Sequence, residues 1–277
     1  MLEIQAGLIA VTTAKRRMST VIRFYRWLIK EEVLNPDNAP WIQSDKFIHF
    51  KTDQGFDISK KVPITDIGIN IPKNHNPFSE YIDDGGALRP LPKSEQEWIL
   101  EALISYGNTE LTLMHLFALV TGARIQTALT FKVRHVLMKR MMSSETNDVR
   151  VPIGPGTGID TKNDKRMVLF IPVWFYEILA TYSQSARAKK RRMKAQNGDT
   201  TDQYLFLSVR GSPFYRSKEE DSAQYDARRK KRYHEDGRSI RTLITEFVIP
   251  IIHRKYDQNF HYRFHDLRAS DTCAMIG

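Results

Sequence analysis

A histidine and an arginine stand three residues apart in the segment Phe264-His265-Asp266-Leu267-Arg268. Residues at this spacing lie on one face of a helix, which would place an imidazole beside a guanidinium. The imidazole can exchange a proton near neutral pH, whereas the planar guanidinium keeps its charge and can bind two oxygens of one anion. Together, His265 and Arg268 are suited to holding a phosphate and moving a proton at it.

Two further cations stand where an anion could be bound. Arg124 follows Thr121-Gly122-Ala123, in which the glycine should end one helix, so Arg124 should begin the next helix beside free backbone N–H groups. Lys162 lies in the polar turn 162–166 between two expected strands, where a lysine amine could donate a proton to a leaving oxygen. Taken alone, each of these residues is more often an ordinary surface cation.

Metal and nucleotide chemistry have weak support. His261 and His265 have the spacing of zinc ligands, but Tyr262 replaces the glutamate of a His-Glu-x-x-His site and no third ligand is suitably spaced. The segment 154–158 is rich in glycine, yet no Gly-Lys-Ser or Gly-Lys-Thr ending follows, so a plain loop is predicted. We therefore expect neither a metal nor a cofactor.

Charge and length bound the function classes. The chain of 277 residues carries 42 Lys and Arg against 32 Asp and Glu, a net charge of +10. This excess favours a polyanionic partner, nucleic acid first and an acidic membrane surface second. No stretch is long and apolar enough to cross a bilayer, the amino end lacks a signal-peptide pattern, and Cys273 is the single cysteine. A cytoplasmic location is predicted.

Residues 1–44 are predicted to be a helical piece, and residues 45–92 a connector with a strand or two. A helix is predicted from Val11 to Lys30, with breaks after it at two prolines. Its basic stripe, predicted to face outward and bind DNA, consists of Arg16, Arg23, Arg26 and Lys30. Its predicted core-facing side consists of Val21, Phe24, Tyr25 and Leu28.

Residues 93–277 are predicted to be mostly helical with a small sheet, so the fold class is mainly α with a small β-sheet, that is, α+β. Ser94 and Glu97 fit a capping box. The predicted helices start near 94 and cover 111–120, 124–134, 174–194 and 240–255, with a last one from 265; the predicted strands are 149–151, 167–171 and a short one at 204–208. Two basic clusters, 187–194 and 228–232, are either DNA contacts or solvated helix ends.

The order of these groups resembles a known family. Thr121-Gly122-Ala123-Arg124, then Lys162 in a strand turn, then His265-Asp266-Leu267-Arg268 is similar to the pattern of tyrosine recombinases, the phage-type integrases. Residues 12–27 resemble the end of that family's helical core-binding domain, which makes 1–44 a partial core-binding domain. Residues from about 91 onward resemble its catalytic domain.

The resemblance implies roles for individual residues. Arg124 and Arg268 would hold the non-bridging oxygens of the scissile phosphate, and His265 would assist proton transfer there. Lys162 would protonate the leaving 5′ oxygen, with Lys165 as the alternative, and Lys165 and Arg166 would also contact DNA. The implied partner is double-stranded DNA with an attachment-type recombination site, on which copies of the chain associate. The implied setting is the nucleoid of a bacterium, with a bacterial or phage gene.

The sequence also departs from the family pattern. The family's nucleophilic tyrosine follows the His-x-x-Arg box by a few tens of residues, which places it beyond Gly277, and earlier helices would precede Val11. The prediction is a fragment, trimmed at both ends, that binds DNA without cleaving it. Thr127 stands where the family often has glutamate. A type IB topoisomerase-like enzyme and a non-catalytic DNA-binding regulator remain as alternatives.

Overall fold

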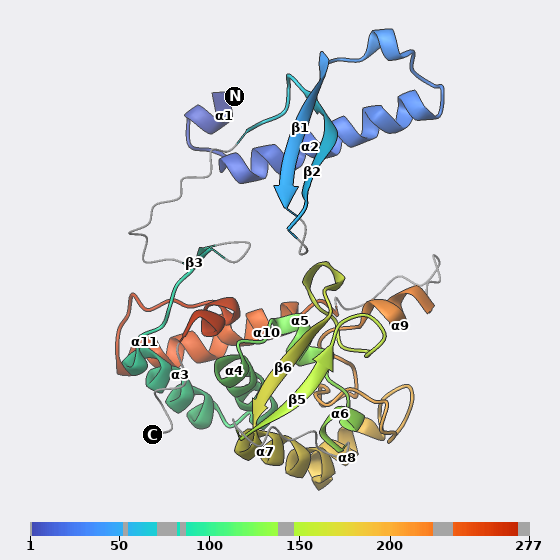
Figure 1. The fold of residues 1–277 in the computed structure, drawn as a ribbon. Coiled ribbons are helices and arrows are strands. Elements are labelled where there is room, and N and C mark those ends of the chain that lie inside the picture. Colours follow the sequence, from blue (N-terminus) through green and yellow to red (C-terminus); the bar gives the residue numbers. More distant parts are fainter. Residues whose placement is uncertain are drawn as a thin grey trace. The chain divides into compact units, whose positions relative to one another are not determined.

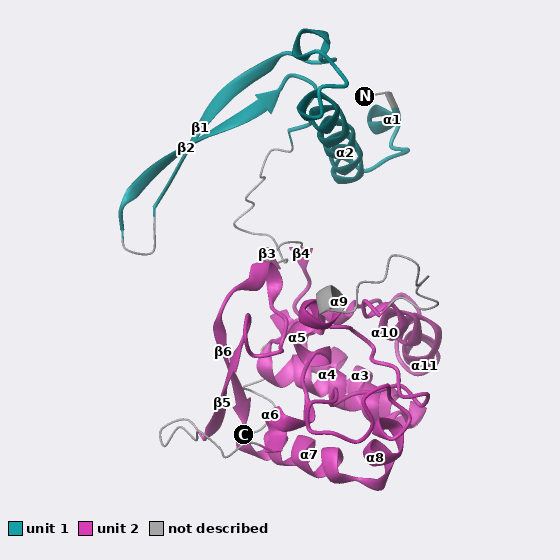
Figure 2. Ribbon diagram, turned by 90° about the vertical axis from the view of Figure 1, so that its right-hand side faces the viewer, with its two compact units in different colours: residues 1–77 teal, residues 78–277 magenta. Residues whose placement is uncertain are grey.

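The computed structural model describes residues 2–51, 55–70, 82–83, 87–137, 147–223 and 235–270. They belong to two compact units, Met1–Pro77 and Phe78–Gly277 (Figure 2). The division lies inside the range 45–92 that the sequence describes as a connector. Helices and small antiparallel two-stranded sheets make up the fold, which is α+β. None of the described helices combines the length and the apolar character that a membrane span requires.

Unit 1 is a long helix with a β-hairpin (Figure 1). After the single turn α1 (Leu2–Gln5), α2 covers Val11–Lys30 with the predicted bounds, and a 3-10 helix follows at Pro36–Asn38. The strands β1 (Gln43–Lys51) and β2 (Asp57–Thr65) pair antiparallel along their whole length. Most of what was predicted as the first part of a connector is therefore a regular hairpin.

The predicted core side of α2 is wrong for two of its residues. Val21 and Phe24 are 45% and 55% exposed, whereas Ile22 is the buried residue of this helix. The hairpin accounts for this difference. Its base lies against the side of α2 that carries Ile22, so this side is covered and the side with Val21 and Phe24 is not. Tyr25 and Leu28, on the predicted side, are only half-buried.

Unit 2 is a helical body with the sheet β5–β6 along one side (Figure 1). Its helices are α3 (Lys93–Tyr106), α4 (Thr109–Thr121), α5 (Ile125–Leu129), α6 (Val133–Leu137), α7 (Val173–Gln184), α8 (Ala186–Arg192), α9 (Lys218–Ala223), α10 (Arg238–Leu243) and α11 (Ile249–Lys255). Its strands are β3 (Ile82–Asp83), β4 (Ala87–Leu88), β5 (Asp148–Ile153) and β6 (Met167–Pro172), paired antiparallel as β3–β4 and β5–β6. A 3-10 helix covers Phe264–Ala269.

The core of unit 2 surrounds α4, as the apolar run 111–120 predicts. Phe117 is fully buried, and its ring meets the rings of Phe131 and Phe175 edge-on at centroid distances of 5.0 and 5.9 Å. Such edge-to-face pairs add to the stabilisation from burial. The predicted end of α4 is confirmed: Gly122 has φ 63°, a left-handed conformation that glycine adopts without strain.

Two predicted features at helix starts are wrong. The capping box of Ser94 and Glu97 is absent, because α3 begins one residue earlier and Pro92 occupies the N-cap position without a side-chain cap. The predicted helix 124–134 is two short helices, α5 and α6. Between them the chain pairs with a distant segment, where the N–H of Leu205 donates to the carbonyl oxygen of Phe131 at 2.8 Å. This extended pairing interrupts the helix.

Two longer predicted helices are also divided. The range 174–194 breaks at Ser185, whose hydroxyl oxygen accepts a hydrogen bond from the N–H of Ala188 at 3.2 Å and so starts α8. The range 240–255 contains a π-helical turn, Ile244–Val248, between α10 and α11. Pro250 follows at the first turn of α11. Because proline has no backbone N–H, it cannot continue the regular α-helical hydrogen bonds, which accounts for the wider turn.

Candidate functional site

Three of the four predicted phosphate-site residues line one cavity. Arg124, Lys162 and Arg268 surround a cavity of about 430 Å³ between the end of α4, the start of α5 and the sheet β5–β6. In the described lining, Asp148 supplies the single carboxylate against these three cations. The cavity therefore carries a positive potential that suits an anion.

The 3-10 helix Phe264–Ala269 brings Arg268 to this cavity. The Nε of Arg268 donates to the carbonyl oxygen of Gly122 at 2.5 Å, which fixes the guanidinium at the carboxyl end of α4, where the helix dipole is negative. His265 is half-buried and lies on the same face as Arg268, because a 3-10 helix has three residues per turn. His265 is not among the residues that line the cavity.

Asp266, between these two residues, holds the 3-10 helix in place. Its buried carboxylate accepts hydrogen bonds from the backbone N–H of Arg263 at 2.8 Å and from that of Arg89 at 3.2 Å. Burial by itself would raise the pKa of Asp266, but the bonds from Arg263 and Arg89 outweigh it and lower the pKa. The carboxylate is thus the anchor that orients the His265–Arg268 segment.

Arg124 is the N-cap residue of α5, with extended backbone angles of φ −70° and ψ 154°. Because α5 has five residues, its dipole is smaller than that of the longer helix predicted from the sequence. The charge at this corner therefore comes mainly from the guanidinium itself, which is half-buried.

Lys162 is carried by a tight turn. The two residues after it, Asn163 and Asp164, have φ of 60° and 54°, a left-handed conformation that costs energy but that, apart from glycine, these two residue types tolerate best. The hydroxyl of Thr161 donates to the carbonyl oxygen of Lys165 at 2.6 Å and closes the turn. Backbone conformations of this kind persist only where the surrounding structure holds them.

Gly154 is required where this turn packs on the end of β5. A Cβ at this position would lie 2.5 Å from the carbonyl oxygen of Lys165. The glycine-rich loop 154–158 therefore supports the turn.

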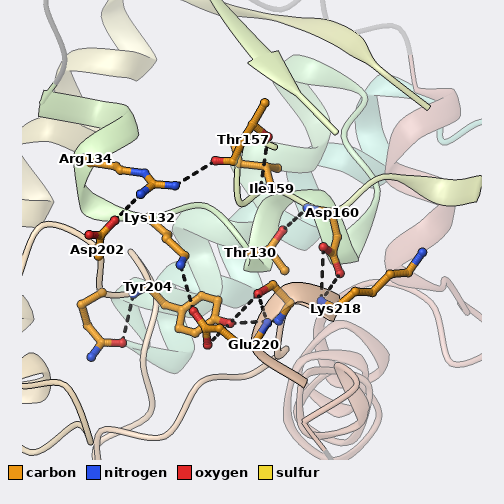
Figure 3. A network of polar contacts seen from close by, with 12 residues as sticks. Thr130, Lys132, Arg134, Thr157, Ile159, Asp160, Asp202, Tyr204, Lys218 and Glu220 are labelled. Atoms are coloured by element: carbon orange, nitrogen blue, oxygen red, sulfur yellow. Dashed lines mark hydrogen bonds and ion pairs between the residues drawn. The ribbon is translucent and has the colours of Figure 1, made fainter. Parts of the chain in front are cut away.

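Buried threonines of α5 and its C-cap tie the Lys162 turn to the helix that begins at Arg124, and Figure 3 shows the contact between Thr130 and Asp160. The hydroxyl of Thr127 donates to the carbonyl oxygen of Asp160 at 2.8 Å, and the N–H of Asp160 donates to the hydroxyl oxygen of Thr130 at 2.9 Å. Both polar groups of the Asp160 backbone are thus held. Thr127, at the position where the resemblance would favour glutamate, couples the segment of Arg124 to that of Lys162.

The other side of the turn is fixed by the start of α9 (Figure 3). The Asp160 carboxylate accepts a hydrogen bond from the backbone N–H of Lys218 at 3.1 Å, while the Nζ of Lys218 lies 2.6 Å from the Asp164 carboxylate. Burial raises the pKa of Asp160, and the N–H of Lys218 partly opposes that shift. The two carboxylates flank Lys162 in the chain and hold its turn against α9.

The remaining predicted DNA-binding residues are placed as follows. Lys165 and Arg166 are exposed on the turn beside Lys162. In unit 1, Arg16, Arg23 and Lys30 are exposed, as predicted for an outward stripe, whereas Arg26 is half-buried. Arg23 and Arg26 also line a second cavity between α2 and the hairpin. The basic run 228–232 lies outside the described residues.

The basic cluster 187–194 is used partly inside unit 2. Arg187 and Arg191 both bind the carboxylate of Glu110, which is 1% exposed, at 2.7 and 2.8 Å. Arg192 pairs with Asp199 at 2.5 Å. These three arginines stabilise the fold, and only the exposed members of the cluster remain available to a partner.

Sequence reasoning missed the residues that position the cations. Thr127 had a signal, since it replaces the family's glutamate within one turn of Arg124, and Asp266 lies inside the His-x-x-Arg box. Asp160 and Lys218 had none, because their contact joins segments 58 residues apart. Among the described residues, no group of three or more His, Cys, Asp or Glu is arranged to hold a metal ion.

The chain matches no protein-family model, no curated protein and no solved structure. The residues of the site and their geometry are therefore what bears on its function.

Proposed function

We propose that this chain has the DNA-binding and phosphate-binding parts of a tyrosine recombinase, and that it binds double-stranded DNA and holds one backbone phosphate between Arg124 and Arg268. Residues 93–277 correspond in this proposal to the catalytic domain. The observation that carries the proposal is the meeting of Arg124, Lys162 and Arg268, which come from three distant segments, around one cavity with a single carboxylate in its described lining.

The chemistry follows from the residue types. Each guanidinium offers parallel N–H donors that match the two non-bridging oxygens of a phosphodiester. As a nucleophile attacks phosphorus, negative charge grows on these oxygens, and cations already in place stabilise that charge. In the family reaction a tyrosine hydroxyl attacks phosphorus and gives up its proton to a base, the bond from phosphorus to the 5′ oxygen breaks, and a 3′-phosphotyrosyl link forms. Lys162 gives its proton to the departing 5′ oxygen.

Duplex DNA is the substrate class that the charges favour. The net charge of +10 suits a polyanion, and Lys165 and Arg166 are exposed beside Lys162, where phosphates on either side of the bound one would lie. Residues 269–277 contain no tyrosine, so binding is the property of this chain that tests the proposal.

The test is a double-mutant cycle on DNA binding. Fluorescence anisotropy with a labelled duplex, at several KCl concentrations, gives the affinity and its salt dependence for wild type, Arg124→Ala, Arg268→Ala and the double variant. Each single variant should weaken binding about tenfold and reduce the log–log salt slope by about 1. Because both arginines hold one phosphate, the double variant should lose clearly less than the sum of the two single losses.

Arg254→Ala is the matched control, because Arg254 is exposed on α11 and does not line the cavity. It should bind DNA like wild type. The proposal fails if the wild-type salt titration is flat, or if the effects of Arg124→Ala and Arg268→Ala are no larger than that of the control. Strict additivity would show that the two arginines bind separate phosphates, contrary to the proposal.

A further inference from the structure

The cavity of unit 2 is larger and more apolar than a phosphate requires. Its volume of about 430 Å³ falls in the range of roughly 300–1,000 Å³ that is typical of sites for small organic molecules. Eight of the sixteen residues in its described lining are apolar. A phosphate gains nothing from such walls, because burying a charge beside apolar groups costs free energy. The apolar half of the lining therefore suits a second, uncharged part of a ligand.

Much of this apolar lining comes from the exposed side of β6. Met167, Val168 and Phe170 line the cavity, and each is about half exposed. Leu169 and Ile171, which alternate with them, are buried in the core of unit 2. The strand thus uses one face for the core and leaves apolar side chains on the other. Exposed apolar side chains gathered beside a charged site are typical of a binding surface.

The floor of the cavity reaches the core. Ala123, Ile153 and Leu169 belong to the lining although all three are buried. The cavity is therefore a recess in the surface of unit 2. In an intact duplex the bases are stacked inside the helix, so only the backbone could meet the rim of the recess. A base that has left the stack could reach the floor.

Phe170 is the side chain best suited to a base. In the β5–β6 register it lies opposite Arg150, whose guanidinium carbon is 5.7 Å from the centroid of the Phe170 ring. An aromatic ring with an arginine beside it is a common surface on which single nucleobases stack. The ring supplies the flat apolar contact, and the cation adds attraction to the nucleic acid.

We propose that the apolar part of this cavity binds an unpaired nucleobase, stacked on Phe170, while Arg124 and Arg268 hold the phosphate of the same nucleotide. A nucleotide matches the cavity because it joins charged oxygens to a flat base with weakly polar faces. The inference rests on the proposed function and adds a preference to it. DNA with one unpaired nucleotide should bind more tightly than a perfect duplex, because extracting a base from an intact stack costs free energy.

A second copy of this chain fits the cavity less well. It could cover the apolar side chains of β6, but its net charge of +10 would bring like charge toward Arg124, Lys162 and Arg268. A nucleotide satisfies both the charged and the apolar parts of the lining.

The experiment measures the affinity of the full chain for three labelled DNAs by fluorescence anisotropy. They are a perfect duplex, the same duplex with one extra unpaired thymine, and that duplex with an abasic site in place of the thymine. The abasic DNA keeps the flexibility of the bulge but lacks the base. Wild type should bind the DNA with the unpaired thymine about fivefold or more tightly than either of the others.

Phe170→Ala should reduce this preference to less than about twofold, and Phe170→Tyr, which keeps an aromatic ring, should retain it. The log–log salt slope should not change in Phe170→Ala because no charge is lost, whereas Arg124→Ala should reduce it. Phe247→Ala is the matched control and should keep the preference. Phe247 is similarly exposed, its ring packs on one neighbour, Tyr106, and it is not in the described lining of the cavity.

A crosslink gives a direct second measurement. With 5-iodouracil in place of the unpaired thymine, irradiation should join the DNA to Phe170, and mass spectrometry of the digested adduct identifies the residue. Circular dichroism checks that each variant is folded.

Equal binding of the three DNAs by wild type, a preference that Phe170→Ala keeps, or crosslinks confined to other residues would overturn this inference. The proposed function then stands if Arg124→Ala and Arg268→Ala still weaken binding of the perfect duplex. If both arginine variants bind every DNA as Arg254→Ala does, the proposed function fails and this inference fails with it. A dimer formed without DNA that Phe170→Ala disrupts, with the preference for the unpaired thymine unchanged, also overturns the inference.

Discussion

The two units bury their apolar residues very differently. In unit 2, a continuous core surrounds α4, and residues such as Ile99, Leu103 and Phe117 are fully buried. Among the described residues of unit 1, the buried apolar ones are Ile22 and Trp41. Burial of apolar surface is the main term that favours folding, so unit 2 has a large internal source of stability that unit 1 lacks.

The same contrast holds for the basic residues. In unit 2, the cationic run of α8 turns two arginines onto the buried carboxylate of Glu110. In unit 1, two of the cations that line the cavity, Arg23 and Arg26, donate to backbone carbonyl groups, and the described lining of the cavity holds no carboxylate. Helix α2 carries six basic residues and α8 carries five, so a count of positive residues ranks the two helices nearly alike. The placement of acidic partners decides which one keeps its charge for a ligand.

The largest expected effect contrasts one aromatic residue from each unit. Phe117→Ala removes a fully buried ring that packs on Phe131 and Phe175, and should lower the free energy of unfolding by about 3–5 kcal/mol. Phe24→Ala removes an exposed ring and should change it by less than about 0.5 kcal/mol. Urea denaturation followed by circular dichroism measures both. Equal losses would show that the Phe24 side of α2 is covered in solution.

The second effect is a loss of stability in mild acid, which should be confined to unit 2. Burial lowers the pKa of His115 and of His135 to about 4, below the usual value of 6.5. Between these pH values the unfolded chain takes up protons that the folded unit does not. Stability is therefore complete above pH 6.5 and falls as the pH drops, by about 2 kcal/mol per histidine at pH 5.

The structure explains why His115 stays neutral. Its Nδ1 lies 2.7 Å from the carbonyl oxygen of Leu111, which can only accept, so Nδ1 carries the proton and Nε2 accepts from the Tyr262 hydroxyl at 3.0 Å. His115→Asn, which cannot be protonated, should reduce the loss between pH 7 and pH 5 by about half. Urea midpoints at the two pH values test this. Equal pH dependence of variant and wild type would contradict it.

The sequence predicted best what local patterns determine. The bounds of α2, the buried helix α4 and its end at Gly122 follow from periodicity and from the properties of glycine. The order Arg124, Lys162, Arg268 nominated three residues that line one cavity. The hairpin β1–β2 was only partly foreseen, because its strands are exposed on both faces and so lack the alternation that marks a half-buried strand.

What the sequence could not give are contacts between distant segments. The bond from Thr127 to Asp160 spans 33 residues, and that from Lys218 to Asp160 spans 58. Nothing local marks either pair, because a buried threonine and a surface threonine look alike in a sequence. The division of the predicted helix 124–134 has the same origin, since its cause is the distant residue Leu205.

A third, smaller effect tests how the site of unit 2 is positioned. Thr127→Val keeps the shape of the side chain but removes the hydroxyl that binds Asp160, and should cost about 1–2 kcal/mol because a buried carbonyl loses its donor. The Lys162 turn should loosen, so DNA affinity should fall by less than in Arg124→Ala. Thr127→Ser keeps the hydroxyl and should restore most of both losses. If serine and valine behave alike, the hydrogen bond does not position the turn.

The smallest effect on stability is expected in the hairpin of unit 1. Asp45 forms an ion pair with Lys61 at 2.8 Å, and their side chains are 42% and 60% exposed. Exposed pairs of this kind contribute little, so Asp45→Asn should change the free energy of unfolding by less than about 0.5 kcal/mol. The substitution removes a negative charge from the hairpin and releases Lys61. Because the basic residues of unit 1 are predicted to bind DNA, DNA affinity should rise a few-fold and the salt slope should steepen. Anisotropy at two KCl concentrations measures this, and unchanged or weaker binding would mean that DNA does not contact the hairpin near Asp45. A mutation that strengthens DNA binding while leaving the fold untouched separates the two units clearly, because in unit 2 the carboxylates that bind arginines also hold the structure together.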